Sequence, residues 1–209
     1  PIVIDGTNAG GYINGSPTIT FSTTNTDSIM LFNAVAGTSG TVSEIKGLNF
    51  EGNGFGTSAV EFLNAQYAKI TNNTISGFKT AGIGFIGSLS QFAEITQNKF
   101  FDNAINIDLG NNGADTNDNG DSDTGSNAKQ NYPVITGVTS TGVNQYTITG
   151  TLNSNSGTTS RIDIYAGLDQ NDVGQYLGSV NTTLSGTNGS FTFNYTGTLV
   201  GPYIKATAS

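Results

Sequence analysis

Cysteine and histidine are both absent from this chain of 209 residues. Without cysteine no disulfide can form, and cysteine usage leaves the redox compartment of the protein undetermined. The two absences also remove the thiol nucleophile and the most common general base of enzymes. Catalytic mechanisms that depend on either side chain are therefore excluded.

Positive charge is scarce as well. Seven Lys and Arg residues stand against 15 Asp and Glu residues, which gives a formal net charge of −8. So few scattered bases cannot follow a phosphate backbone, which excludes nucleic-acid binding and disfavours an anionic membrane surface. No apolar run approaches the length of a membrane-spanning helix. The chain begins at Pro1 without a signal peptide, so we expect it to be a processed or excised piece of a longer protein.

Glycine, asparagine, threonine and serine dominate the polar residues that are present. Charged residues make up only 11% of the chain and aromatic residues reach 10%. Disordered chains usually have high charge and few aromatic or β-branched residues. The composition therefore predicts a folded all-β protein with many turns.

An internal repeat occupies the first half of the chain. Residues 44–52, 69–77 and 94–102 align without a gap, at a spacing of 25 residues. A second set, residues 58–63, 80–86 and 103–109, follows these segments at a similar spacing. The apolar residues that align are Ile45, Ile70 and Ile95, then Phe50, Ile75 and Phe100, and in the second set Val60, Ile83 and Ile105.

These repeats are too short and too rich in glycine and asparagine for helical units, and their apolar residues alternate with period two. They predict rungs of a parallel β-helix over residues 1–112, stacked about 4.8 Å apart so that aligned apolar side chains form inner columns. Glycine and asparagine are expected at the bends, because they tolerate left-handed backbone conformations. Earlier runs at 1–5, 18–21 and 28–32 predict less regular rungs.

The repeat ends at Tyr132-Pro133. Six strand-like runs separated by turn residues follow, at residues 134–140, 145–152, 161–168, 176–184, 190–195 and 203–207. They predict a small antiparallel β-sandwich of immunoglobulin-like type over residues 132–209. The chain stops inside the last run, so the sandwich is either truncated or left with an unfinished edge.

The densest charge lies between these two regions. Residues 102–123 contain six carboxylates and neither lysine nor arginine. So many carboxylates in one short segment repel one another unless a cation lies among them. The segment alternates oxygen-bearing residues around Gly120, with the spacing of a calcium loop. The predicted calcium ligands are Asp115, Asn117, Asn119, Asp121 and Asp123, with Asp108 and Asp118 as additional candidates.

The loop has the spacing of an EF-hand without being one. Asp115, Asn117, Asn119, Asp121 and Asp123 would occupy positions 1, 3, 5, 7 and 9, with Gly120 at position 6. Position 12, where an EF-hand needs Glu, is Ser126, and no helix is predicted on either side. We therefore expect residues 113–131 to form a junction loop that calcium stiffens. The alternative is a solvated acidic linker that binds nothing specific.

Nearly the whole chain resembles the bacterial secreted parallel β-helix proteins of the CSLREA-domain surface-protein type. The residues that carry this resemblance are 1–12, the aligned rungs, 107–125 and, as the exit from the loop, Gln130-Asn-Tyr-Pro-Val134. The resemblance implies a right-handed β-helix that ends in such a loop and is followed by a β-sandwich. It also implies an extracellular or cell-surface location and an adhesive or structural role.

Polysaccharide lyases and glycoside hydrolases form the competing class, since parallel β-helices often carry such enzymes. Arg161, the only arginine, falls in the predicted sandwich, and Glu44 and Glu94 align with Lys69 between them, which favours mutual ion pairing over catalysis. The sequence therefore predicts a non-enzymatic structural or adhesive module; a polysaccharide-degrading or polysaccharide-binding protein is the alternative. Expected partners are neighbouring domains of a larger chain or identical copies joined end to end, and surface glycans.

Overall fold

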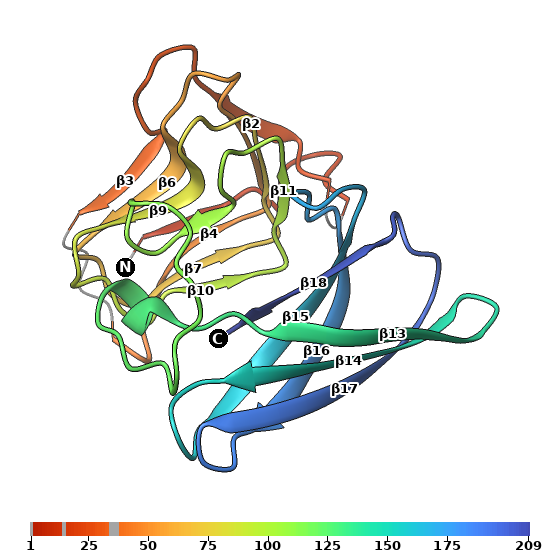
Figure 1. The fold of residues 1–209 in the computed structure, drawn as a ribbon. Coiled ribbons are helices and arrows are strands. Elements are labelled where there is room, and N and C mark those ends of the chain that lie inside the picture. The colour runs from red at the N-terminus through yellow and green to blue at the C-terminus, as the bar shows by residue number, and fades with distance from the viewer. Residues whose placement is uncertain (1, 14–15, 34–37) are drawn as a thin grey trace. The chain divides into compact units, whose positions relative to one another are not determined.

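The computed structural model describes residues 2–13, 16–33 and 38–209. It is all-β and divides into two compact units (Figure 1). Residues 1–115 and 124–129 form the first, here called the solenoid unit, and residues 116–123 and 130–209 form the second, the antiparallel unit. The acidic segment is thus divided between the two units. Across the described part of the chain, no helix has the length and apolarity needed to cross a membrane.

The solenoid unit contains three parallel sheets, with orders β1-β4-β7-β10, β11-β8-β5-β2 and β12-β9-β6-β3 among the described residues. Each successive triplet of strands stacks on the previous one, as the predicted repeat requires. The strands are β1 (Val3–Asp5), β2 (Ile19–Ser22), β3 (Met30–Asn33), β4 (Ser43–Lys46), β5 (Leu48–Glu51), β6 (Ser58–Leu63), β7 (Ala68–Thr71), β8 (Thr74–Ser76), β9 (Ala81–Ile86), β10 (Glu94–Thr96), β11 (Lys99–Phe101) and β12 (Ile107–Asp108).

Aligned apolar side chains form the inner columns of the solenoid. Ile45 pairs with Ile70 and Ile70 with Ile95 in the sheet that starts with β1. Phe50, Ile75 and Phe100 are in register in the second sheet. The rings of Phe62 and Phe85 stack in the third sheet, with centroids 4.7 Å apart. The parallel stacking predicted from the spacing of 25 residues is confirmed.

One aligned position is shifted by two residues. Ile83 pairs with Ile107 in β12 and not with the predicted Ile105. The carbonyls of Ile105 and Asn106 accept hydrogen bonds from Gly82 and Ile83, so they pair with the start of β9. A shift of two residues keeps the same face of a strand inward, and the alternation of apolar residues therefore could not reveal it.

The bends between strands recur at the same spacing. Gly47, Asn72 and Gln97 follow β4, β7 and β10, with φ values of 67°, 56° and 58°. All three are in the left-handed region, which glycine and asparagine adopt most readily. The prediction that such residues mark the bends holds at Gly47 and Asn72, and glutamine fills the third equivalent position.

A ladder of buried asparagines lies beside these bends. The side-chain oxygen of Asn98 accepts hydrogen bonds from the backbone N–H and the side-chain amide of Asn73, both at 3.0 Å. Asn98 Nδ2 donates to the carbonyl of Ile70 at 2.7 Å, and Asn73 Nδ2 donates to the carbonyl of Ile45 at 3.1 Å. Each asparagine therefore satisfies backbone groups of a neighbouring rung that water cannot reach.

The antiparallel unit contains two three-stranded sheets, with orders β13-β14-β17 and β16-β15-β18. Side chains of both sheets form one core, which includes Ile148, Ile162, Ile164 and Phe191. All six predicted strands are present and antiparallel. They are β13 (Val134–Gly142), β14 (Gln145–Asn153), β15 (Thr159–Gly167), β16 (Gln175–Thr183), β17 (Asn188–Thr196) and β18 (Tyr203–Ala208).

Candidate metal centre

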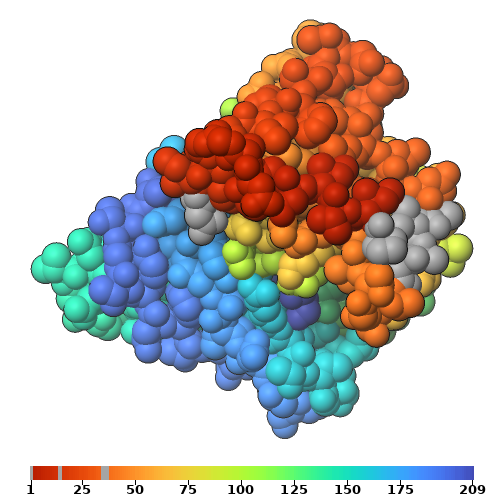
Figure 2. Space-filling view, turned by 180° about the vertical axis from the view of Figure 1, so that it is seen from behind, coloured from red at the N-terminus to blue at the C-terminus, as the bar shows by residue number. Residues whose placement is uncertain are grey.

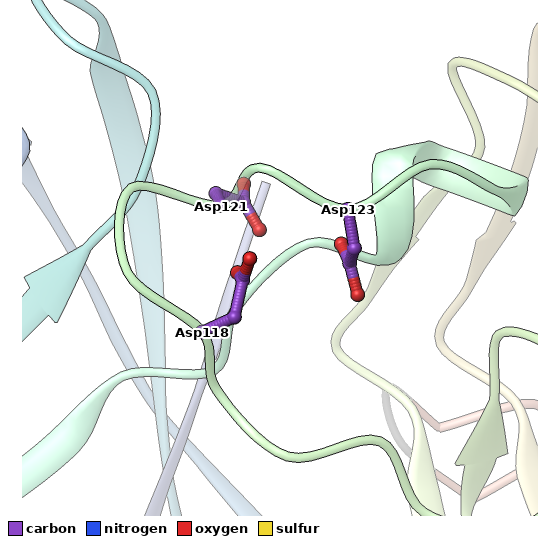
Figure 3. Close-up of side chains that lie close together, drawn as sticks. All are labelled: Asp118, Asp121 and Asp123. Carbon is purple, nitrogen blue, oxygen red and sulfur yellow. The ribbon is translucent and has the colours of Figure 1, made fainter.

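Three carboxylates of the acidic segment meet in the antiparallel unit. Asp118, Asp121 and Asp123 each offer a carboxylate oxygen, and these three oxygens lie within 4.8 Å of one another. Figure 3 shows the three side chains on one loop, with those of Asp118 and Asp121 facing each other. Oxygen atoms of this kind and at this separation are the ligands that calcium prefers.

Asp121 is the most buried of the three. It is only 3% exposed and adopts a left-handed conformation directly after Gly120, with φ values of 56° and 77° respectively. Its Oδ1 accepts a hydrogen bond from the backbone N–H of Asn131 at 2.8 Å, and its Oδ2 accepts one from Ser154 Oγ at 2.7 Å. The turn at Gly120 therefore directs the carboxylate of Asp121 inward.

Asp118 is held by the turn that follows it. Its Oδ2 accepts hydrogen bonds from Ser122 Oγ at 2.7 Å and from the Ser122 N–H at 3.0 Å. The hydroxyl of Ser122 is the main cause that lowers the pKa of Asp118, with a further contribution from the Ser122 N–H, while partial desolvation opposes them. Because the charged form is favoured, Asp118 offers an ionised carboxylate to the cluster.

Asn131 ties the loop to the rest of the antiparallel unit. Its side-chain oxygen accepts a hydrogen bond from the N–H of Asp118 at 3.0 Å, and its Nδ2 donates to the carbonyls of Asp118 and Asn153 at 2.8 and 2.9 Å. The neighbouring Gln130 donates to Ser154 Oγ at 2.9 Å. The exit sequence that begins at Gln130 is thus the framework on which the three carboxylates are held.

The other predicted ligands have different partners. Asp115 belongs to the solenoid unit, where it forms an ion pair with Lys129 at 2.7 Å. Asn117 uses its amide on the backbone N–H and carbonyl of Tyr132, at 2.9 and 2.8 Å. Asn119 is exposed. Of the alternating set the structure brings together only Asp121 and Asp123. It adds Asp118, one of the two additional candidates named from the sequence.

Asp108 closes a turn of its own in the solenoid unit. Its Oδ1 accepts hydrogen bonds from the N–H groups of Gly110 and Asn112, at 3.1 and 3.4 Å, and its Oδ2 accepts one from Gly113 at 3.0 Å. A carboxylate after a strand commonly satisfies the backbone of the following turn in this way. This role accounts for the burial of Asp108.

The segment after the cluster packs on the last corner of the solenoid. Asn127 donates its N–H to the carbonyl of Ser90, and its side-chain amide binds both the N–H and the carbonyl of Ala93. Ser126 Oγ donates to the carbonyl of Gly87, and Gln91 donates to the carbonyl of Gly125. The short 3₁₀ segment η1 (Ser126–Lys129) is thus a cap for exposed backbone groups.

Of the carboxylates considered for glycoside hydrolysis (Glu44, Glu51, Glu61, Glu94 and Asp102), Glu44 and Glu94 lie in an ion-pair ladder. In register across three strands, Lys69 lies between Glu44 and Glu94. Lys69 pairs with Glu94 at 3.1 Å, and Lys46 pairs with Glu44 and with Asp5, both at 3.3 Å. The alternation of acids and bases predicted for this face of the solenoid is confirmed.

Comparison of the chain with protein-family models and with the sequences of curated proteins finds no match. The resemblance to secreted parallel β-helix proteins therefore rests on the residues of this chain alone. What it implies for the location and function of the protein is a hypothesis.

Proposed function

We propose that the chain is a non-enzymatic extracellular structural or adhesive module whose acidic loop is stiffened by calcium. The single observation that carries this proposal is the meeting of three carboxylates within 4.8 Å in that loop. We further propose that the solenoid is a right-handed β-helix and that the two antiparallel sheets form a β-sandwich. The core shared by the two antiparallel sheets supports the sandwich, and the family resemblance supports the handedness.

Calcium fits the cluster chemically. Asp118, Asp121 and Asp123 would bind the ion, which would supply the positive charge that cancels their mutual repulsion. A carboxylate has about four lone-pair sites. The two oxygens of Asp121 accept one hydrogen bond each from Asn131 and Ser154, so both keep electron pairs for a metal. Backbone carbonyls of the loop and water would complete the six to eight ligands that calcium takes.

The cluster lies next to the point where the chain passes from one unit to the other, so ion binding there would affect the flexibility of the linker. Residues 116–123 belong to the antiparallel unit, and residues 124–129 belong to the solenoid unit. An ion that orders the first segment would limit the freedom of the chain where it passes from one unit to the other. The proposed role is therefore to stiffen a joint and not to catalyse a reaction.

Thermal unfolding with chelator and with millimolar calcium tests this proposal. A ligand present at 100 times its dissociation constant stabilises the native state by about 2.7 kcal/mol, which corresponds to several degrees in a chain of this size. The double variant Asp118→Asn and Asp123→Asn should lose that increase, whereas Asp27→Asn, at an exposed position, should keep it. An equal calcium effect in the double variant and the wild type would contradict the loop site.

The proposed partners are a second copy of the chain or neighbouring domains joined to the first rung. Among the described residues, β1, β2 and β3 are each the last strand of a sheet, and such edges accept further strands. Ile2, Val3 and Leu31 are more than half exposed there, and Figure 2 shows the first strands, in red and orange, at the surface. Sedimentation at rising concentration should reveal association that Val3→Lys prevents. Monomers at every concentration would contradict self-association.

Polysaccharide binding is the second candidate, and one observation favours it. Phe92 is 63% exposed and stacks on Tyr67 at a centroid distance of 4.6 Å, and exposed rings of this kind offer an apolar face to sugars. Affinity electrophoresis against a polysaccharide panel should show retardation that Phe92→Ala removes. New reducing ends or unsaturated products after incubation would overturn the non-enzymatic proposal itself.

A further inference from the structure

One corner of the solenoid presents two aromatic rings on successive rungs. Gln66 and Gln91 pair in parallel there, and Tyr67 and Phe92 follow them in the chain. The two rings stack with centroids 4.6 Å apart and an angle of 15° between their planes. Phe92 is 63% exposed although Tyr67 covers one face of its ring. The exposed surface of Phe92 therefore lies at the ring edge and on the opposite face.

The backbone of both aromatic residues is in the left-handed region, with φ values of 54° at Tyr67 and 60° at Phe92. A bulky side chain rarely adopts this region, because its Cβ comes too close to the backbone. Elsewhere the solenoid places residues such as Gly47 and Asn72 in it. Val42 precedes β4 as Tyr67 precedes β7, and its φ is not positive. Parallel pairing beyond this corner therefore does not require the strained conformation.

The stability of the fold does not account for the ring of Phe92. Aromatic side chains stabilise a protein through the apolar surface that they bury, and this one remains mostly exposed. Asparagine tolerates the left-handed region and would be the less strained residue at the same position. Strained backbone that persists at an exposed position is typical of functional sites. The ring is thus better explained by a ligand than by packing.

The corner carries no charge. Residues 64–68 and 87–93, which form it on two successive rungs, contain neither Asp, Glu, Lys nor Arg. Lys69 and Glu94, the charged residues that follow them, pair with each other at 3.1 Å. The net charge of the whole chain is −8, so anionic ligands are repelled at long range, and the corner contains no base to attract them. These observations favour an uncharged ligand.

Hydrogen-bonding groups border the ring face. Gln66 is exposed, and among the described residues neither its side-chain amide nor the hydroxyl of Tyr67 has a hydrogen-bond partner. We infer that this corner binds an uncharged polysaccharide. The C–H face of one sugar stacks on Phe92, and hydroxyls of neighbouring sugar units bond to Gln66 and Tyr67. The inference rests on the polysaccharide-binding candidate proposed above, and it adds the ligand class and the residues that hold the ligand.

Affinity electrophoresis tests the ligand class, since the net charge of −8 carries the native protein into the gel. Gels that contain a neutral polymer, hydroxyethyl cellulose or galactomannan, should retard the wild-type chain, whereas gels that contain polygalacturonate should not. Retardation at rising polymer concentration gives the dissociation constant. Phe92→Asn should raise this constant at least about tenfold, and Phe92→Tyr, which keeps the ring, should change it by less than about twofold.

The melting temperatures of the same variants separate binding from a structural role. Because asparagine tolerates the left-handed region, Phe92→Asn should unfold at the wild-type temperature or above it, while retardation is lost. A ring that served the fold would give a lower melting temperature and unchanged retardation. Phe55→Asn is the matched control, because Phe55 is 55% exposed and does not have a positive φ. It should keep full retardation.

Four results would overturn the inference. Retardation by polygalacturonate alone would exclude an uncharged ligand, and equal retardation of Phe92→Asn and the wild type would exclude the site. A dimer in sedimentation that Phe92→Asn dissociates would show that a second copy of the chain covers the corner. No retardation in any gel would overturn the polysaccharide-binding candidate as well. The calcium-stiffened module is tested separately, because its melting shift with calcium should be the same in Phe92→Asn and the wild type.

Discussion

Two polar ladders run through the solenoid at the same spacing of 25 residues, one inside and one outside. Asn73 and Asn98 stack in the interior and bind backbone groups of neighbouring rungs. Glu44, Lys69 and Glu94 stack on an outer face in the same register, half exposed to water. Repetition therefore places polar groups of both kinds, but only the inner ladder replaces hydrogen bonds that water cannot supply.

The two ladders have the same spacing, but their contributions to the free energy of unfolding should differ widely. A buried donor or acceptor left without a partner costs about 1–3 kcal/mol. Removing one inner asparagine leaves several buried backbone groups without partners, so these costs add. An exposed ion pair contributes only about 0.2–1 kcal/mol, because water screens it and ordering two long side chains costs entropy. The inner ladder should thus determine stability, and the outer one should affect it little.

The largest effect is expected for Asn98→Ala. Asn98 is 2% exposed, and its loss would leave the N–H of Asn73 and the carbonyl of Ile70 unsatisfied. We expect a decrease of about 3 kcal/mol or more in the free energy of unfolding, measured by urea denaturation. Asn49→Ala, at a half-buried outer position, is the control and should cost less than about 1 kcal/mol. Equal costs would remove the distinction between the two ladders.

An intermediate effect is expected for Asp108→Ala. This carboxylate is buried like the inner ladder but belongs to neither ladder, and three backbone N–H groups depend on it. Its removal should cost about 2 kcal/mol and speed hydrogen exchange at Gly110 and Gly113, because their donors lose a charged acceptor. Asp102→Ala, at an exposed bend, should leave exchange at those two amides unchanged. Protection that persists without Asp108 would contradict the role assigned to its carboxylate.

A small effect is expected for Lys69→Met on the outer ladder. The change removes the ion pair with Glu94 at 3.1 Å but keeps the aliphatic part of the side chain. Stability should fall by less than about 1 kcal/mol, and the difference should vanish at 1 M salt, where screening acts within about 3 Å. Lys79→Met, at an exposed position, should show neither effect. A larger cost that persists in high salt would place the outer ladder in the same class as the inner one.

The smallest effect concerns the acid end of the outer ladder. The hydroxyl and N–H of Thr7 hold the pKa of Asp5 below its ordinary value, with help from Lys46. A lowered pKa in the folded state means stability that is complete above the ordinary pKa, about 3.9, and lost as the pH falls through the folded value. In a carbon-detected titration, Thr7→Val should raise the pKa of Asp5.

The same titration contains its own control. Ser122 lowers the pKa of Asp118 by the same kind of hydrogen bond. Ser122→Ala should therefore raise the pKa of Asp118 and leave that of Asp5 unchanged. A Thr7→Val variant whose Asp5 titrates as in the wild type would contradict the role assigned to the Thr7 hydroxyl, and would leave the residue 7 N–H and Lys46 as the groups that lower the pKa of Asp5.

The columns of the solenoid could be read from the sequence because a repeat fixes its own register. Ile45, Ile70 and Ile95 had to stack once the strands were parallel and equally spaced, and the acids and bases beside them followed. The position of Ile107 could not be read in this way, since a shift of two residues preserves the alternation on which the prediction rests.

The candidate sites show the same limit more clearly. The sequence indicated the acidic loop through its charge. The spacing of every second residue selected Asp115, whose partner is Lys129, and left Asp118 as an additional candidate only. The turn at Gly120 and the hydrogen bonds of Asn131 decide which carboxylates meet, and no spacing pattern in the sequence contains these contacts.

The sequence by itself determined the strands and the parallel stacking, since these follow from local alternation and a fixed repeat. Only the tertiary structure decided which oxygens converge. Asp118, Asp121 and Asp123 converge because the turn at Gly120 and the hydrogen bonds of Asn131 hold them in place. Local patterns report periodicity, whereas a binding site depends on distances across the fold, which no pattern in the chain encodes directly.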